Sequence, residues 1–165
     1  MPDNVYLGNP NLKKANTPIE FTEEQIIEFV QCQRDPVYFA NKYVKIVSLD
    51  EGLVPFQPYR FQEKLINNFH ENRFNICKMP RQTGKSTTVV SYLLHYAIFN
   101  DSVNIGILAN KAATARELLG RLQTAYENLP KWMQQGIMVW NKGSLELENG
   151  SKILAASTSA SAVRG

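Results

Sequence analysis

The chain has 165 residues, of which 44% are hydrophobic and 20% are charged, and its net charge at pH 7 is +3. This length suits one well-packed domain, and the composition is ordinary for a soluble globular protein. No stretch approaches the roughly 18 apolar residues of a membrane span, and the first residues lack the apolar core of a secretion signal. The mildly basic charge permits a nucleic-acid partner without requiring one, because a solvated basic surface explains it equally well.

The first third of the chain is predicted to be an arm followed by a helical segment. Residues 1–20 have little periodicity and frequent Asn and Pro, so we expect a flexible arm without structure of its own. Residues 21–55 are predicted to be helical. Thr22 is the expected N-cap of one helix, with Gln25 completing a capping box, and Asp35-Pro36 carries the start signals of a second. Cys32 lies in this segment, and it and Cys77 are expected to be buried, reduced thiols.

The region after residue 56 is predicted to start with a helix and then to alternate strand and helix. The expected elements are a helix over 58–69, a strand over 74–78, a helix over 85–99, a strand over 103–109 and a helix over 111–129. The run VNIGILA at 103–109 is continuously apolar, which is typical of a strand buried on both faces. This order predicts an α/β fold with a parallel sheet flanked by helices.

The pattern changes after Pro130. Three short strands are predicted over 137–141, 144–147 and 152–156, and Asn149-Gly150 is a strong signal for a two-residue hairpin turn between the last two. Residues 157–165 are rich in Ser and Ala and are expected to form a loop.

The stretch MPRQTGKST, from Met79 to Thr87, carries the most chemical information. It lies between a predicted strand and a predicted helix and fits the phosphate-loop pattern G-x-x-x-x-G-K-[ST], except that Met79 replaces the first Gly. In such a loop the backbone N–H groups surround phosphate oxygens at a helix N-terminus, where the helix dipole also favours an anion. The pattern predicts a site for a nucleoside triphosphate.

The residues of this loop have separate expected roles. Gly84 lets the backbone approach the phosphates closely, Lys85 reaches the β- and γ-phosphates, and the Ser86 hydroxyl ligates Mg²⁺. Thr87 adds a donor to the α-phosphate. The loop residues Gln82 and Thr83 complete the predicted binding set.

Two roles for Arg81 fit the sequence equally well. An arginine at this position lies close to where charge builds on a transferring phosphoryl group, so it could act as an arginine finger supplied by the same chain. It could also be a surface arginine that only adds to the positive field.

The segment PFQPYRFQ, at 55–62, indicates ATP rather than GTP. A glutamine amide is both donor and acceptor and can pair with N6 and N7 of adenine, while an aromatic neighbour stacks on the ring. Gln57 and Gln62 are therefore candidates for base recognition. The alternative is an ordinary amphipathic helix start.

No acidic pair that could activate water follows the loop. An ATPase of this kind needs an Asp-Glu pair at the end of a later buried strand. The run from Lys45 to Glu51 resembles one but precedes the loop, and we expect it to be a surface loop. Glu146 and Glu148 are expected on the solvated side of a strand. We therefore expect the acidic strand to lie beyond Gly165.

From Phe56 onward the chain resembles the N-terminal ATPase domain of the large terminase subunit, the DNA-packaging motor of tailed bacteriophages, in its contractile-tailed type. The matching segments cover about two thirds of the chain in the family's order: PFQPYRFQ, PRQTGKSTTVV, IGILANKAATARELLGRL, ENLPKWMQQGI, WNKGSLELENGSKILA and SAVRG.

The resemblance implies a P-loop ATPase of the RecA-like, additional-strand type, present in part as residues 56–165 and without the family's nuclease domain. In this family an R-Q-x-G-K-[ST] loop is usual, so Met79 is expected. The resemblance further implies that Arg81 is the arginine finger, that Gln57 or Gln62 recognises adenine, and that ATP and Mg²⁺ bind the loop.

The resemblance also implies partners and location. The partners would be double-stranded DNA, the portal of the prohead, the small terminase subunit and further copies of the chain in a ring, in the host cytoplasm and without a membrane. Two alternatives remain: a superfamily-2-like helicase or DNA-dependent ATPase, and a non-catalytic nucleotide-binding or assembly module. Because the acidic pair is missing, we expect little ATP turnover from these residues alone.

Overall fold

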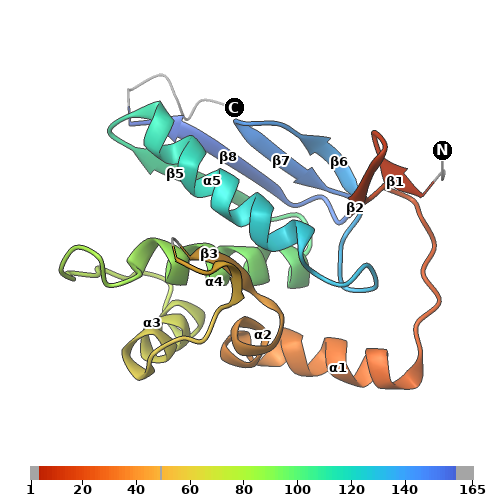
Figure 1. The fold of residues 1–165 in the computed structure, drawn as a ribbon, viewed down its shortest axis with the longest axis horizontal. Helices are drawn as coiled ribbons and strands as arrows, with labels where there is room; N and C mark the ends of the chain where they lie inside the picture. Colours follow the sequence, from red (N-terminus) through yellow and green to blue (C-terminus); the bar gives the residue numbers. More distant parts are fainter. Residues whose placement is uncertain (1–3, 49, 159–165) are drawn as a thin grey trace.

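The computed structural model describes residues 4–48 and 50–158, which form a mixed α/β structure (Figure 1). A four-stranded sheet lies on one side, and helix α5 (Ala112–Glu127) packs directly on it. Helix α4 (Lys85–Phe99) lies under α5 and separates it from α2 (Pro36–Tyr43) and α3 (Arg60–Glu71). The longest described helices thus form layers on one face of the sheet.

The N-terminal helices begin where the sequence predicts. In α1 (Glu23–Arg34) the Thr22 hydroxyl accepts from the Gln25 N–H and the Gln25 side chain accepts from the Thr22 N–H, which is the predicted capping box. In α2 the Asp35 carboxylate accepts from two first-turn N–H groups and Pro36 occupies the first position. These short-range signals hold because each cap satisfies backbone donors that the helix itself leaves free.

The sheet is mixed rather than parallel, which corrects the predicted fold. Its strand order is β5 (Asn104–Ala109), β8 (Lys152–Ser157), β7 (Ser144–Leu147) and β6 (Ile137–Trp140). Only β5 and β8 run parallel, and α5 lies between them in the chain. The β6–β7 and β7–β8 pairs are antiparallel because connections of a few residues can only reverse the chain.

The predicted hairpin between β7 and β8 is present with a different turn. The Gly150 N–H donates to the Leu147 carbonyl at 3.0 Å and the Leu147 N–H donates to the Ser151 carbonyl at 2.9 Å, so the loop has three residues. Gly150 has φ +82°, the left-handed position that favours glycine in such a loop. The Asn149 amide donates to the Ala97 carbonyl at 2.9 Å, so the turn also binds the end of α4.

Strand β5 is buried on one face only, contrary to the prediction. Ile107 is buried, whereas its neighbour Leu108 is 47% exposed. Leu154 of β8 is likewise exposed at 50%. The helices cover one face of the sheet (Figure 1). Successive side chains of a strand point to opposite faces, so every second side chain of β5 faces away from the helices.

The predicted strand over 74–78 is wrong for this structure. Residues 73–80 pair with none of the described strands, and Phe74 and Ile76 are 84% and 101% exposed. A strand requires a neighbour for its backbone groups, and the described sheet offers none to this segment. Cys77 lies here and is exposed, which also corrects its predicted burial, whereas Cys32 is buried as predicted.

Part of the predicted arm forms a β-hairpin, which corrects the expectation of an arm without structure of its own. Strands β1 (Val5–Tyr6) and β2 (Asn9–Lys13) form an antiparallel hairpin beside β6 (Figure 1). Lys13 pairs with Glu148 at 2.9 Å, and its N–H donates to Gln134 at 3.0 Å. Glu148 was expected on a solvated face, yet it also accepts from the Asn16 N–H at 2.8 Å. These partners lie more than 120 residues away in sequence, so periodicity cannot indicate them.

Part of the predicted helical segment is a second hairpin. Strands β3 (Lys45–Ser48) and β4 (Gly52–Pro55) pair antiparallel, where a surface loop was expected. Phe56 follows β4, and its N–H donates to the Val44 carbonyl at 2.8 Å. This hairpin forms one wall of the site described below.

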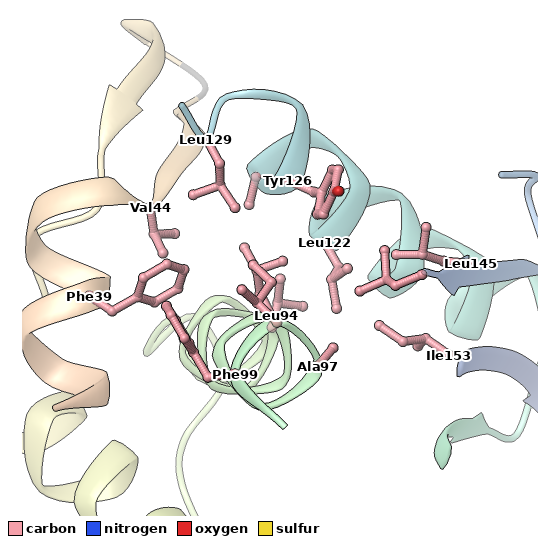
Figure 2. Packing of buried hydrophobic residues seen from close by; sticks show 14 of the residues in the cluster. Phe39, Val44, Leu94, Ala97, Phe99, Leu122, Tyr126, Leu129, Leu145 and Ile153 are labelled. Atoms are coloured by element: carbon pink, nitrogen blue, oxygen red, sulfur yellow. The ribbon is translucent and has the colours of Figure 1, made fainter. Parts of the chain in front are cut away.

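The core lies around α4 (Figure 2). Figure 2 shows Phe39 and Val44 on one side of Leu94, and Leu122 and Tyr126 of α5 on the other. His95 is also buried, at 2% exposed. Its Nε2 donates to the Cys32 carbonyl at 2.9 Å, and its Nδ1 has no hydrogen-bond partner among the described residues. Burial lowers the pKa of His95 to about 4.

We expect Leu12→Ala to lower the free energy of unfolding by about 2–4 kcal/mol, because it removes a side chain that is only 1% exposed. The matched control is Leu7→Ala at the hairpin tip, where the side chain is 88% exposed and the change should be under about 0.5 kcal/mol. Urea denaturation measures both. Equal small effects would mean that the N-terminal hairpin does not dock in solution.

His95 should make stability fall with acidification. Its pKa is about 4 in the folded chain and near 6.5 when unfolded, so between these values the unfolded chain binds the extra proton. Stability should therefore drop by about 2 kcal/mol from about pH 7.5 to about pH 5, as measured by urea denaturation. His95→Gln should flatten this dependence, whereas His70→Gln should leave most of it, because His70 contributes less than burial to the lowered pKa of His95. An unchanged slope in His95→Gln would contradict the assignment.

Candidate functional site

The N-terminus of α4 and the loop before it form the centre of the candidate site. Gly84 is the N-cap of α4 and has φ +70°, and Gln82 is also left-handed with φ +60°. Two left-handed residues within three positions turn the chain sharply into the helix. Thr83 lies between them, and its hydroxyl donates to the Pro80 carbonyl at 3.0 Å, which closes the turn.

Lys85 is folded back into this loop. Its Nζ donates to the Met79 carbonyl at 2.9 Å and also to the carbonyl of Pro80. Carbonyl oxygens are neutral, so they position the ammonium without cancelling its charge. A full positive charge is therefore held inside the loop at the start of α4.

No side chain of the described residues caps the first turn of α4. Gly84 has none to offer, in contrast to Thr22 and Asp35 at the starts of α1 and α2. The first N–H of the helix to find a partner inside it belongs to Thr88, which donates to the Gly84 carbonyl at 2.9 Å. The preceding N–H groups have no intrahelical acceptor, and together with the helix dipole they favour an anion.

Helix α3 meets this loop through Gln62, which is 3% exposed. Its Oε1 accepts from the Tyr59 N–H at 2.8 Å, and its Nε2 donates to the Thr83 carbonyl at 3.3 Å. A Cβ placed on Gly84 would lie 2.4 Å from Gln62 Nε2, so a larger residue at this position would have to displace this amide.

A pocket of about 610 Å³ opens beside the loop. One wall is the loop and α4, and the other is the β3–β4 hairpin with the start of α3. The residues that line it are Ile46, Pro55, Phe56, Gln57, Tyr59, Phe61, Gln62, Gln82, Thr83, Gly84 and Thr87. None of these described residues is Asp or Glu, so the lining adds no negative charge to the positive loop.

Two aromatic rings stand at the mouth of this pocket. Tyr59 and Phe61 are stacked, with ring centroids 5.8 Å apart and planes 11° apart, and they are 71% and 45% exposed. Gln57 lies beside them with an exposed side chain. Exposed flat rings next to an unburied amide can take a planar heterocycle by stacking and hydrogen bonding.

A second cavity, of about 720 Å³, lies between β3, α4 and α5. It shares the lining residues Ile46 and Thr87 with the first, so the two cavities are adjacent. Gly120 of α5 lines it, and a Cβ there would meet nothing within 4 Å.

The structure brings most of the predicted residues together. Six of them line the pocket, namely Gln57, Gln62, Gln82, Thr83, Gly84 and Thr87, and Lys85 lies in the same loop. Arg81 and Ser86 are exposed at the loop and the start of α4 and do not belong to the lining. The sequence did not indicate Ile46 and Pro55 as site residues. They belong to the β3–β4 hairpin, and local patterns predicted neither this hairpin nor its place beside the loop.

Residues 76–165 match a protein family described as the terminase large subunit, T4likevirus-type, N-terminal. The match covers more than half of the chain. The chain belongs to this family of terminase large subunits. Its role is therefore that of a DNA-packaging terminase, and the resemblance drawn from the sequence motifs is confirmed.

The terminase match covers the phosphate side of the candidate site and not its aromatic side. It includes the whole loop from Met79 to Thr87, with α4, α5 and the four-stranded sheet. Gln57, Gln62 and the β3–β4 hairpin precede it. The phosphate side of the pocket thus lies in the family-matched region, and the aromatic side lies before it.

The described residues lack two further features. No helix among them is both long and apolar enough to cross a membrane. Residues 4–48 and 50–158 also contain no group of three or more His, Cys, Asp or Glu side chains placed to hold a metal ion. A metal at this site would need most of its ligands from elsewhere than these side chains.

Proposed function

We propose that this terminase chain binds ATP at the loop before α4. The loop would be the phosphate-binding half of the ATP site in the motor that packages viral DNA. The observation that carries the proposal is the uncapped, glycine-started N-terminus of α4 with the Lys85 ammonium held in its loop. This is an anion site built from backbone N–H groups, a helix dipole and one fixed cation. Its place inside the terminase match supports a nucleotide as the anion.

The loop fits a polyphosphate. Gly84 brings the backbone close to a ligand, and Lys85 needs only to exchange its two carbonyl contacts for phosphate oxygens. Such an exchange replaces neutral acceptors by charged ones, which bind an ammonium more strongly. Ser86 and Thr87 add hydroxyl groups at the first turn of α4.

The aromatic side fits a base. Tyr59 and Phe61 offer a stacked pair of rings at the pocket mouth, and Gln57 offers both an amide donor and an acceptor. Adenine presents an acceptor at N7 and a donor at N6, which an amide matches with two hydrogen bonds. We therefore propose ATP as the nucleotide.

Mg²⁺ is proposed to bind with the nucleotide, held by the Ser86 hydroxyl. Mg²⁺ in such sites keeps several waters and takes further oxygen ligands from the phosphates, so the Ser86 hydroxyl would be one ligand among several. When bound, it would neutralise charge that builds on the phosphates. The group that activates water is not among the described residues that line the pocket, because none of these is acidic.

The proposed motor would use ATP to move double-stranded DNA into a prohead, with the portal, the small subunit and further copies of the chain as partners. Membership of the terminase family supports DNA, the portal and the small subunit as partners in general. Arg81 is proposed to act on the transferring phosphoryl group, because it is exposed on the same loop as Lys85.

Lys85→Ala should weaken ATP–Mg²⁺ binding about 30- to 100-fold, because hydrogen bonds to a charged group contribute about 2–3 kcal/mol. Isothermal titration calorimetry measures the dissociation constant. Lys78→Ala is the matched control, since it removes the same charge at an exposed position before the loop. If both variants bind ATP as well as the unaltered protein, the loop is not the phosphate site.

Arg81→Ala should lower ATP turnover by about 10³-fold in the packaging-competent enzyme while changing ATP affinity by less than about tenfold. The reason is that an arginine finger acts on charge that develops only in the transition state. Arg73→Ala, an exposed arginine on the segment before the loop, is the control. Equal losses of turnover and affinity would make Arg81 a simple phosphate-binding residue. Undetectable turnover in the unaltered, assembled enzyme would favour the non-catalytic alternative.

A further inference from the structure

Helix α4 has no cap of its own at its C-terminal end. An α-helix leaves its last four carbonyl groups without a donor inside the helix, and in α4 these belong to residues 97–100. Asn100, the C-cap, is extended with φ −127° and ψ 136°, so it does not close the helix as a left-handed glycine would. The last turn of α4 also contains no basic residue that could bind these carbonyls. Any protein donor to them must come from another element.

Asn149, in the turn between β7 and β8, supplies most of these donors. Its Nδ2 lies 2.9 Å from the Ala97 carbonyl oxygen, 3.1 Å from that of Asn100 and 3.5 Å from that of Ile98. A side-chain amide nitrogen carries only two hydrogens, so the two shorter contacts are the main ones. One side chain thus closes the end of a helix that lies 49 to 52 residues away in sequence.

The Asn149 amide is itself held in one orientation. Its Oδ1 accepts from the Ser151 N–H at 3.1 Å, so Nδ2 must face the helix. Its main-chain carbonyl accepts from the Ser102 N–H at 2.9 Å. The Ser151 hydroxyl, in a residue that is fully buried, donates to the Asn100 carbonyl at 2.8 Å. The β7–β8 turn therefore binds both the last turn of α4 and the segment that leads into β5.

Two further side chains complete this junction. Gln135 Nε2 donates to the Ile98 carbonyl at 3.2 Å. Gln33 Nε2 donates to the Phe99 carbonyl at 3.4 Å. All four final carbonyls of α4 are thus paired with side chains from other elements, in contrast to its first turn, where Gly84 offers no capping side chain. The helix is fixed at one end and has free backbone donors for an anion at the other.

We propose that Asn149 is a positioning residue for the phosphate-binding end of α4. The helix has 15 residues, so its two ends are about 22 Å apart. A packed helix of this length moves as one body, so the bonds at residues 97–100 determine where its first N–H groups stand relative to the loop. Because coupling between two sites is reciprocal, a ligand that holds the first turn also stabilises the junction with the β7–β8 turn. The inference rests on the proposed nucleotide site and adds a distant residue that controls it.

The test compares Asn149→Asp with Asn141→Asp, which make the same change and add the same charge in two neighbouring turns. Asn149→Asp keeps the acceptor for the Ser151 N–H and removes both donors to α4. The Asn141 amide, among the described residues, bonds only within its own turn. Dissociation constants for inorganic tripolyphosphate and for ATP, both with Mg²⁺, are measured by calorimetry. Asn149→Asp should weaken both ligands by a similar factor of about fivefold, and Asn141→Asp should leave both unchanged.

Hydrogen exchange in the unaltered protein tests the reverse direction, and it decides the matter if Asn149→Asp does not fold. Saturating tripolyphosphate with Mg²⁺ should slow the exchange of the Ser151 and Ser102 N–H groups, which donate to Asn149, by up to about the same fivefold factor. The N–H groups of Gly143 and Ser144 are the internal control, because they donate to the asparagine of the other turn and should change less. Nuclear magnetic resonance measures each group separately.

Two results would overturn the proposal. One is a folded Asn149→Asp variant that is less stable but binds both ligands as well as the unaltered protein, which would make the role of Asn149 structural only. The other is equal slowing of exchange at the two turns when tripolyphosphate is added. If the unaltered protein binds neither ligand, the proposed nucleotide site itself fails, which is a different outcome from both.

Discussion

The structure depends on α4, a helix that is largely buried but whose first backbone N–H groups have no acceptor within the helix. The far part of α4 is enclosed by α2, α3 and α5, so its position is determined on several sides. Its first turn, in contrast, begins at a glycine without a capping side chain. Burial of the helix offsets the cost of leaving those backbone donors free, and the free donors make an anion site possible.

The elements that are not part of the loop serve to hold it. Helix α3 reaches the Thr83–Gly84 turn through the Gln62 amide, and the β3–β4 hairpin forms the opposite wall of the pocket. At the other end of α4, the Asn149 amide binds the Ala97 carbonyl and joins the helix to the hairpin of β7 and β8. The terminase site is thus positioned by contacts among α3, α4 and the sheet, which are far apart in sequence.

Local signals predicted the helix caps and the position of the β7–β8 hairpin correctly, whereas the length of its turn and the non-local pairing were predicted wrongly. The caps at Thr22 and Asp35 and the glycine at Gly150 act within a few residues, so sequence alone places them. The predicted strand over 74–78 failed because a strand depends on a neighbour rather than on its own side chains. The N-terminal hairpin was missed for the converse reason, since the ion pair of Lys13 with Glu148 spans 135 residues.

The sequence by itself determined the chemistry of the loop and the family. The order of residues from Met79 to Thr87 specifies a glycine, a lysine and two hydroxyls at a helix start, and these need only local backbone geometry to lie together. Only the tertiary structure decided which residues face that loop. Gln57 and Gln62 are equivalent candidates in sequence, yet packing of α3 on α4 buries one amide against Thr83 and leaves the other at the mouth. Such a distinction arises from contact between separate elements, which no pattern within one of them can encode.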